Sequence, residues 1–408
     1  MIDPSMKLAA RQDDGNIKVF AVAAGLFVIS GTVLWLYNAL FSKFATFFAL
    51  TYGEQAWLIS LFNIFYFVMA IPAALCHRQF GYKLGLLFGL CVIGVGAFLL
   101  YFAIIQHCFA YFLGAVVMMG TCGAWLDTSL NPMTVEAGSP QTSVRRLNFA
   151  HVFGGIGLLV GCVTALWLIG THYQLSSGEA AKLSARPYVL VGLVAIFLAY
   201  FVEQVNFPDF ATIRAERSAC LRRDVASLVG DGNFLFAAIS LCAFSVAMTV
   251  IWSANPHYST AEFPQHQAWL VMHGYFWFVV GRIIGVALMR VVDPSRLLRW
   301  CVGLSLVAVV MASMLGGMSG WICMLSVSLF LSIVFPTVVG LSLYGLGLRT
   351  KLAAGILVTM SGIGGAVAPL FVRPALVSLN VHTAILLAVP FLAVVLAYSL
   401  TMRPQTCR

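Results

Sequence analysis

The chain has 408 residues, of which 61% are hydrophobic and 9% are charged, and its mean hydropathy is +0.96. A soluble domain carries roughly 25% charged residues, so this composition excludes an ordinary cytosolic enzyme. The net charge of +9 does not indicate a nucleic-acid-binding protein, because the Lys and Arg residues are spread over polar connectors instead of gathering on one face.

Apolar runs, cut at charges and turn residues, predict twelve membrane-spanning helices, because about 20 apolar residues are needed to cross a bilayer. The first run is too long for the core of a signal peptide and is not followed by a small-residue cleavage pattern, so we expect it to be retained. In chain order the predicted spans lie at about 19–42, 55–76, 84–106, 108–131, 148–171, 186–206, 233–254, 267–289, 297–317, 319–347, 352–377 and 381–402.

A polar stretch near the middle of the chain separates six predicted spans from six. We therefore expect five regions. They are an N-terminal tail at 1–18, an N-terminal six-helix bundle at 19–206, a central loop at 207–232, a C-terminal six-helix bundle at 233–402 and a tail at 403–408.

An internal repeat supports this division, because Pro132 and Arg145 recur as Pro336 and Arg349 with a shift of 204 positions. Two matched halves in parallel orientation are typical of major facilitator transporters. The predicted fold is therefore an all-α membrane protein with the major facilitator fold, containing twelve transmembrane helices in two six-helix bundles.

Most Lys and Arg residues fall in the termini and in alternate connectors, which predicts the cytoplasmic side of the membrane. The other side holds only Lys43, Lys182, Arg186 and Arg373. We therefore expect both termini and the central loop to be cytoplasmic, in a multi-pass protein of a bacterial inner membrane.

The ten cysteines lie mostly inside apolar runs without paired spacing, so we interpret them as small buried hydrophobes. The His, Cys and Asp residues show no metal-ligand spacing, and no nucleophile–base pair of an enzyme is evident. We therefore expect no metal, no cofactor and no enzyme activity. The expected partners are a small-molecule substrate and the lipid bilayer, without nucleic acid, and the expected state is a monomer.

Asp127 is the one acid that falls deep within a predicted span. A charge in the hydrocarbon costs at least about 2.5–3.5 kcal/mol, so it implies a partner, a water-filled cavity or a function. Asn131 lies four residues further along and shares its helix face. Asp127 is thus a candidate proton-coupling or substrate-binding carboxylate, and a structural hydrogen bond or ion pair between helices is the alternative.

His151 and Arg282 are the next candidates. His151 falls at a depth similar to that of Asp127 and could share its proton, or it could bond a backbone carbonyl instead. Arg282 is the one cation deep in a span. It could contact an anionic substrate, pair with Asp127 across the two halves, or extend its side chain to the interface.

Polar and aromatic side chains within the spans complete the candidate substrate site. Asn38 and Asn148 would be unsatisfied in hydrocarbon, so they either bond to neighbouring helices or line the pathway, and the same holds for Asn63. The aromatic candidates are Trp35, Tyr275 and Trp277, for which packing is the alternative. Six other histidines, including His382, fall at loops or span ends, where we expect solvated side chains.

The sequence resembles the fucose–galactose–glucose:proton symporter family, the fucose permease branch of the major facilitator superfamily. The matching motifs include Leu126-Asp127-Thr128 with Asn131-Pro132, then Gly281-Arg282 and Phe335-Pro336-Thr337. The resemblance occurs in order along nearly the whole chain, at residues 65–67, 71–74, 81–83, 126–132, 146–150, 281–282, 335–337, 345–347, 350–351 and 364–369.

This resemblance implies a central cavity between the halves and proton-coupled sugar uptake, with the family's fourth-span glutamate replaced by Asp127. Three positions depart from the pattern. Asn38 stands for the family's first-span aspartate, His151 for a glutamine and Gly154 for an asparagine. These replacements argue against an ordinary hexose substrate and leave Asp127, with His151, as the protonatable pair.

The sequence therefore predicts a secondary active transporter that moves a small polar organic solute, sugar-like or another metabolite, by alternating access. Asp127 and His151 would couple protons. Asn38, Asn131, Asn148, Trp35, Tyr275, Trp277 and Arg282 would contact substrate. Two alternatives stay open: a proton-independent exporter of a metabolite or metal chelator, and a membrane sensor with a transporter-like fold.

Overall fold

The computed structural model describes residues 4–171, 176–205, 207, 220–262 and 267–402. Within these ranges every regular element is helical, which confirms the predicted all-α fold. Eleven segments are long and apolar enough to cross a membrane, and a shorter apolar helix at Met272–Leu288 corresponds to the remaining predicted span.

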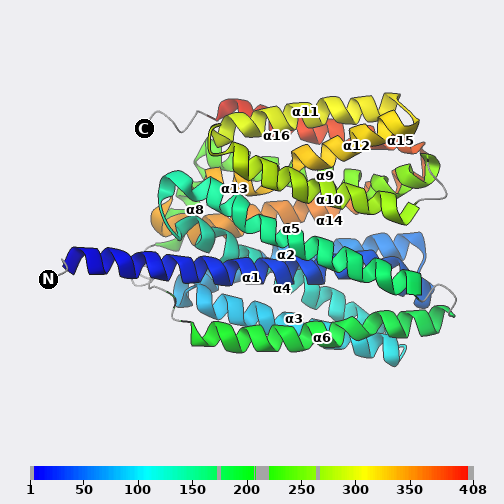
Figure 1. Ribbon diagram of the computed structural model, residues 1–408, viewed down its shortest axis with the longest axis horizontal. Helices are drawn as coiled ribbons and strands as arrows, with labels where there is room; N and C mark the ends of the chain where they lie inside the picture. The colour runs from blue at the N-terminus through cyan, green and yellow to red at the C-terminus, as the bar shows by residue number, and fades with distance from the viewer. Residues whose placement is uncertain (1–3, 172–175, 206, 208–219, 263–266, 403–408) are drawn as a thin grey trace.

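The N-terminal half contains six long helices, which pack side by side in the lower part of Figure 1. They are α1 (Pro4–Phe47), α2 (Tyr52–Phe80), α3 (Tyr82–Ile105), α4 (Phe109–Glu136), α5 (Ser143–Thr171) and α6 (Ser177–Gln204), with the short helix η1 (Pro140–Thr142) before α5.

The C-terminal half repeats this arrangement in the upper part of Figure 1. Its helices are α9 (Gly232–Glu262), α10 (Gln267–Leu288), α11 (Pro294–Met314), α12 (Gly317–Leu331) with α13 (Val334–Leu343), α14 (Thr350–Ser378), and α15 (Val381–Ala384) with α16 (Ala388–Thr401). The short helices η2 (Gly347–Arg349) and η3 (Ile385–Leu387) precede α14 and α16.

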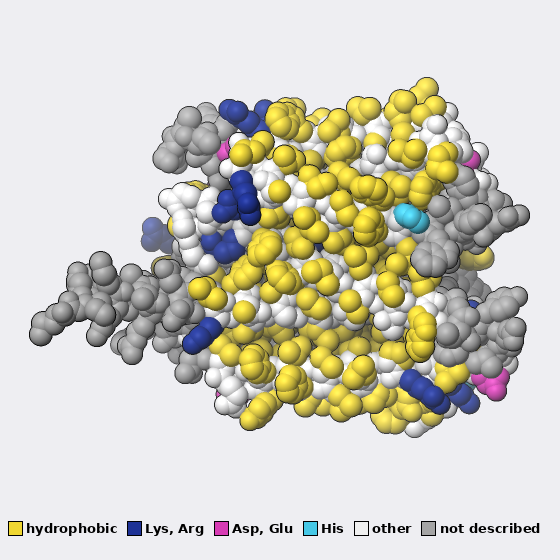
Figure 2. Space-filling view, viewed as in Figure 1, with side chains coloured by type: hydrophobic (Ala, Val, Ile, Leu, Met, Phe, Trp, Pro, Cys, Tyr) yellow, Lys and Arg dark blue, Asp and Glu magenta, His cyan; other side chains and the backbone are white. Residues whose placement is uncertain are grey.

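The predicted tails and central loop differ in detail from the structure. The first span continues without a break to Pro4, so the described part of the predicted tail is helical. The central loop contains a short amphipathic helix, α8 (Leu221–Val229). The described chain begins and ends at one end of the bundle, on the left of Figure 1, which we call the terminal end. Figure 2 shows hydrophobic side chains across the middle of this face of the molecule and several basic side chains toward the terminal end.

Glycines allow the helices that form the centre of the molecule to cross at close range. A Cβ atom at Gly157 would lie 2.1 Å from the Val28 carbonyl oxygen, where α5 crosses α1. A Cβ at Gly365 would lie 2.3 Å from Asn63 Oδ1, where α14 crosses α2. Close approach of helix backbones is the reason small residues are enriched at such crossings, and here the second crossing joins the two halves.

Candidate functional site

A cavity of about 340 Å³ lies between the two halves of the molecule. Its wall is formed by α1, α2, α3, α4 and α5 from the first half and by α9, α10, α13 and α14 from the second. Most of the lining side chains are apolar or aromatic, and a few convergent polar groups interrupt them. This combination is typical of small-ligand sites.

Asp127 lines this cavity from α4 and is half-buried. Its Oδ2 accepts a hydrogen bond of 2.6 Å from the hydroxyl of Tyr66 on α2, whereas its Oδ1 has no hydrogen-bond partner among the described residues. One oxygen is therefore fixed and the other is available. A carboxyl group in this position can hold a proton or accept a bond from a ligand hydroxyl.

His151 lines the cavity from α5 and connects to Asn131 behind it. The His151 Nε2–H group donates to Asn131 Oδ1 over 2.8 Å, and Asn131 itself is fully buried. Asn131 therefore orients the imidazole instead of lining the cavity. The structure does not place Asp127 and His151 within hydrogen-bond distance of one another.

Arg282 lines the cavity from α10, on the wall formed by the second half. Its Nε and Nη2 donate to the Ser332 carbonyl, and its Nη1 donates to the His151 carbonyl over 2.8 Å. No ion pair joins Arg282 to Asp127, although the sequence left this pairing open. The side chain is thus held by backbone carbonyl groups, and it does not extend away from the site.

Contacts between the halves separate the cavity from the terminal end. Asn148 Nδ2 donates to Thr337 Oγ1 over 3.1 Å, which joins α5 to α13. Asn148 precedes His151 on a helix that begins at the terminal end, so this bond lies on the terminal side of the cavity. Asn148 is fully buried and does not line the cavity.

Comparison with known proteins places this architecture in a family. A sequence model of the Major Facilitator Superfamily matches residues 23–369. The chain belongs to the Major Facilitator Superfamily. The family and the relatives that we describe next are transporters, so the prediction that the chain is not an enzyme is confirmed.

Two curated relatives align with most of the chain. The chain is 28% identical to an L-fucose-proton symporter of Haemophilus influenzae, over 86% of this chain and 87% of the relative. It is also 28% identical to a glucose/galactose transporter of Brucella abortus, over 92% of each. These similarities confirm the resemblance to the fucose permease branch.

A solved structure of the same superfamily has the same fold. The crystal structure of the transporter FucP in its outward conformation superimposes with a TM-score of 0.83 and 23% sequence identity, over 94% of this chain and 98% of FucP. The predicted major facilitator fold, with twelve helices in two bundles, is therefore confirmed.

Besides Asn131 and Asn148, three more of the predicted substrate residues lie outside the cavity wall. Asn38 is exposed on α1, one turn beyond the lining residue Leu34, and it donates to the Leu34 carbonyl. Tyr275 packs behind Trp35 at a ring distance of 4.9 Å. Trp277 contacts Phe276. Trp35 does line the cavity, and it contacts Trp252 of α9 at 4.5 Å between ring centroids.

Several polar lining residues were absent from the predicted site. Tyr66 is the partner of Asp127, and Asn63 lies one turn earlier on the same face of α2. From the second half, the Ser245 and Ser361 hydroxyls contact each other over 2.7 Å at the cavity wall. Asn63 was visible in the sequence as a polar group within a span, whereas single serines in apolar helices carry no comparable signal.

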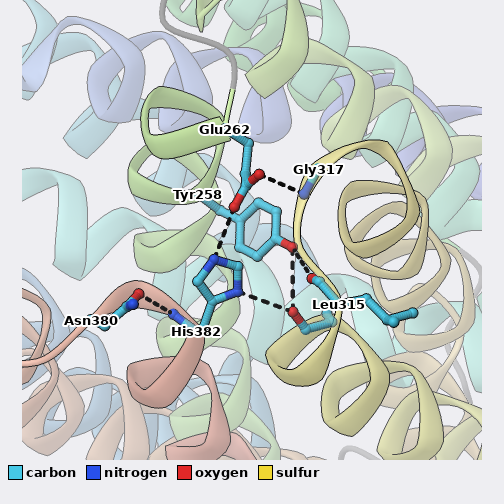
Figure 3. Close-up of polar contacts among 7 residues, drawn as sticks. Tyr258, Glu262, Leu315, Gly317, Asn380 and His382 are labelled. Carbon is cyan, nitrogen blue, oxygen red and sulfur yellow. Dashed lines mark hydrogen bonds and ion pairs between the residues drawn. The ribbon is translucent and has the colours of Figure 1, made fainter.

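A second polar cluster lies away from the cavity, and Figure 3 shows its contacts. Glu262 Oε1 pairs with His382 Nε2 at 2.9 Å, and Glu262 Oε2 accepts from the Gly317 backbone N–H over 2.5 Å. Tyr258 donates to the Leu315 carbonyl over 2.9 Å. His382 was expected to be solvated, but its side chain is largely buried because the end of α9 and the turn between α11 and α12 cover it.

Proposed function

We propose that this transporter is a proton-coupled symporter of a sugar-like organic solute and that Asp127 carries the coupling proton. The relatives in Haemophilus influenzae and Brucella abortus are named as a fucose–proton symporter and a glucose/galactose transporter. The observation that carries the proposal is the position of Asp127, whose carboxyl group faces the cavity with one oxygen held by Tyr66. An ionisable residue inside a membrane protein is a functional candidate by default.

The transport cycle follows from the contacts between the halves. Alternating access in this fold is a rocking of one half against the other around a central site. Opening the cavity toward the terminal end requires the Asn148–Thr337 bond to break, together with the bond from Arg282 to the His151 carbonyl. Binding of proton and substrate favours whichever arrangement binds them more tightly, so their loading can drive this separation.

We further propose that the terminal end faces the cytoplasm of a bacterium and that the protein acts as a monomer in the inner membrane. The excess of Lys and Arg residues in the termini and alternate connectors supports this orientation. The cavity is complete within one chain, which supports a monomeric transport unit.

Transport by purified protein in proteoliposomes tests the proposal. We expect labelled L-fucose or D-galactose to exchange in counterflow without an energy source, and to accumulate when a proton gradient is imposed. Asp127→Asn should reduce proton-driven accumulation more than tenfold and leave counterflow, because the amide cannot carry a proton. Glu203→Gln is the matched control, since Glu203 is an exposed acid paired with Lys83.

Each other outcome has a defined meaning. Accumulation that is unchanged in Asp127→Asn would remove the coupling role from this residue. Counterflow that does not respond to a proton gradient would indicate the proton-independent carrier. The absence of counterflow across a broad panel of sugars and sugar derivatives would favour the sensor.

A further inference from the structure

The guanidinium of Arg282 lines the cavity with part of its hydrogen-bonding capacity unused. Three of its N–H groups bond the carbonyl oxygens of Ser332 and His151. A guanidinium has five N–H groups, so two are left for a ligand. Its central carbon lies 4.7 Å from the centroid of the Phe278 ring, which fixes the plane of the group. The side chain is therefore rigid before any ligand binds.

Its charge has no acidic partner in the described part of the chain. The ion pairs found there are Arg78–Asp224, Lys83–Glu203 and His382–Glu262. Carbonyl dipoles reduce the cost of burying a cation but leave its net charge, and an unpaired buried charge is strongly unfavourable. A ligand that enters the cavity with a negative charge would supply the missing countercharge.

The internal repeat provides a comparison within the same molecule. Arg78 precedes Arg282 by 204 positions, the shift that also relates Pro132 to Pro336. Arg78 is buried at the end of α2 and pairs with Asp224 of α8 at 2.8 Å. The first half thus neutralises its arginine with an acid of the chain, whereas the second half exposes its arginine to the substrate cavity.

We propose that the cavity binds a hexose-sized hydroxylated monocarboxylate, such as a sugar acid, with the carboxylate on Arg282. This inference rests on the proposed function and specifies its substrate class. Guanidinium–carboxylate pairs are often bidentate and stronger than bonds between neutral groups. The serine hydroxyls of Ser245 and Ser361 and the amide of Asn63 provide partners for the remaining hydroxyl groups.

The charges in the cavity then explain how proton and substrate move together. The titratable groups that line the cavity are Asp127, His151, Arg282, Tyr37, Tyr66 and Cys122, whereas α9, α13 and α14 add no charged side chain to its wall. A protonated Asp127, a cationic Arg282 and one bound carboxylate sum to zero. An ionised Asp127 would repel the carboxylate in this poorly solvated space. One proton and one monoanion therefore enter together, and the cycle moves no net charge.

The binding experiment compares D-galacturonate with D-galactose, which differ at C6 by a carboxylate in place of a hydroxymethyl group. Titration calorimetry on the purified full-length protein should show galacturonate binding at least tenfold more tightly. Arg282→Gln should weaken galacturonate about 100-fold and abolish the preference for galacturonate over galactose, because only the acid uses the charge. Arg282→Lys should weaken galacturonate less than Arg282→Gln does, since it keeps a point charge without the planar fork.

Arg78→Gln is the matched control, because it removes the repeat-related arginine outside the cavity, and it should leave both affinities unchanged. A second readout uses proteoliposomes on a capacitive electrode. Galacturonate uptake with a proton should give no current, whereas uptake of neutral galactose with a proton should give one.

Equal affinity for the two sugars in the wild-type protein would overturn the inference, as would preference for galacturonate that survives in Arg282→Gln. Neither result affects proton-coupled sugar transport. That proposal fails separately, if Asp127→Asn accumulates its sugar like the wild type.

Discussion

Asp127 on α4 and Glu262 at the C-terminal end of α9 are both partly buried acids, yet their surroundings differ. Glu262 uses both carboxylate oxygens, one for His382 and one for the Gly317 backbone N–H (Figure 3). Asp127 uses one oxygen for Tyr66 and presents the other to the cavity. The first acid joins α9, α12 and α15, whereas the second acid leaves capacity for a proton or a ligand.

A structural acid and a functional acid can therefore be distinguished by whether both carboxylate oxygens have hydrogen-bond partners within the protein. A buried polar group whose bonds are all made inside the protein rigidifies its surroundings. A group with unused capacity beside a cavity is poised to exchange partners. The same criterion distinguishes Arg78, which pairs with an acid of the chain, from Arg282, which bonds only backbone carbonyl groups. Substitutions in the two regions should therefore alter different properties, stability in one and transport in the other.

The largest effect on stability is expected from Glu262→Ala. The substitution leaves His382 Nε2 and the Gly317 N–H without their partner, whereas His382 Nδ1 keeps its contact with the Ala312 carbonyl, and each orphaned buried group costs about 1–3 kcal/mol. We expect a loss of about 2–4 kcal/mol in the free energy of unfolding, measured as a lower Tm in detergent. Uptake per folded molecule should stay within twofold of the wild type.

Glu203→Gln serves as the control for Glu262→Ala, because the side chain of Glu203 is 58% exposed and surface ion pairs contribute little. Its Tm should match that of the wild type. If Glu262→Ala unfolded like the wild type but lost transport, the distinction between the two acids would be wrong.

Much of this fold could be predicted from the sequence. The twelve apolar runs correspond to the helical spans of the structure, and the Pro132–Pro336 repeat anticipated the two matched halves. Membrane helices are readable in this way because the hydrocarbon core requires long apolar segments with internally bonded backbones. The helical continuation of α1 to Pro4 was missed, because polar residues mark where the membrane ends and do not mark where a helix ends.

The candidate site was less predictable, because a sequence gives the depth of a residue in a span but not the rotation of its helix. Depth identified Asp127, His151 and Arg282, and Trp35 was one of the aromatic candidates; all four line the cavity. Asn38 has a comparable depth, yet it bonds its own helix backbone and lies outside the wall.

Long-range partners were beyond sequence reasoning for a related reason. Tyr66 and Asp127 are 61 positions apart, and Glu262 and His382 are 120 apart. Neither separation in sequence predicts a contact, so only the packing of the helices shows that these residues are partners.

Tyr66→Phe sharpens the comparison from the side of the cavity. It removes the one hydrogen bond that orients Asp127 and leaves the ring in place. A hydrogen bond to a charged group is worth about 1.5–3 kcal/mol, so loss of orientation should lower the rate of proton-driven uptake about tenfold. Initial uptake rates in proteoliposomes provide the measurement.

Tyr37→Phe is the matched control for Tyr66→Phe. Tyr37 also lines the cavity, but its hydroxyl has no hydrogen-bond partner among the described residues. Removal of this hydroxyl should leave the uptake rate unchanged. Equal losses in the two variants would mean that Phe substitution disturbs the cavity in general, and that orientation of Asp127 by Tyr66 does not matter.

Tyr258→Phe should have the smallest effect of these variants, and we expect it to lower stability and to leave transport unchanged. The Tyr258 hydroxyl is buried and donates to the Leu315 carbonyl at the turn before α12, next to the Glu262–His382 pair. Tyr258→Phe removes a neutral hydroxyl that is shared between the Leu315 and Ala312 carbonyls, and it should cost about 1 kcal/mol in the free energy of unfolding. Thermal denaturation should show a small decrease in Tm, with the proton-driven uptake rate of the wild type. A tenfold loss of uptake in Tyr258→Phe would show that the cluster of Figure 3 is coupled to the cavity. Asp127 and Glu262 would then both affect transport, and the assignment of Glu262 to stability alone would be wrong.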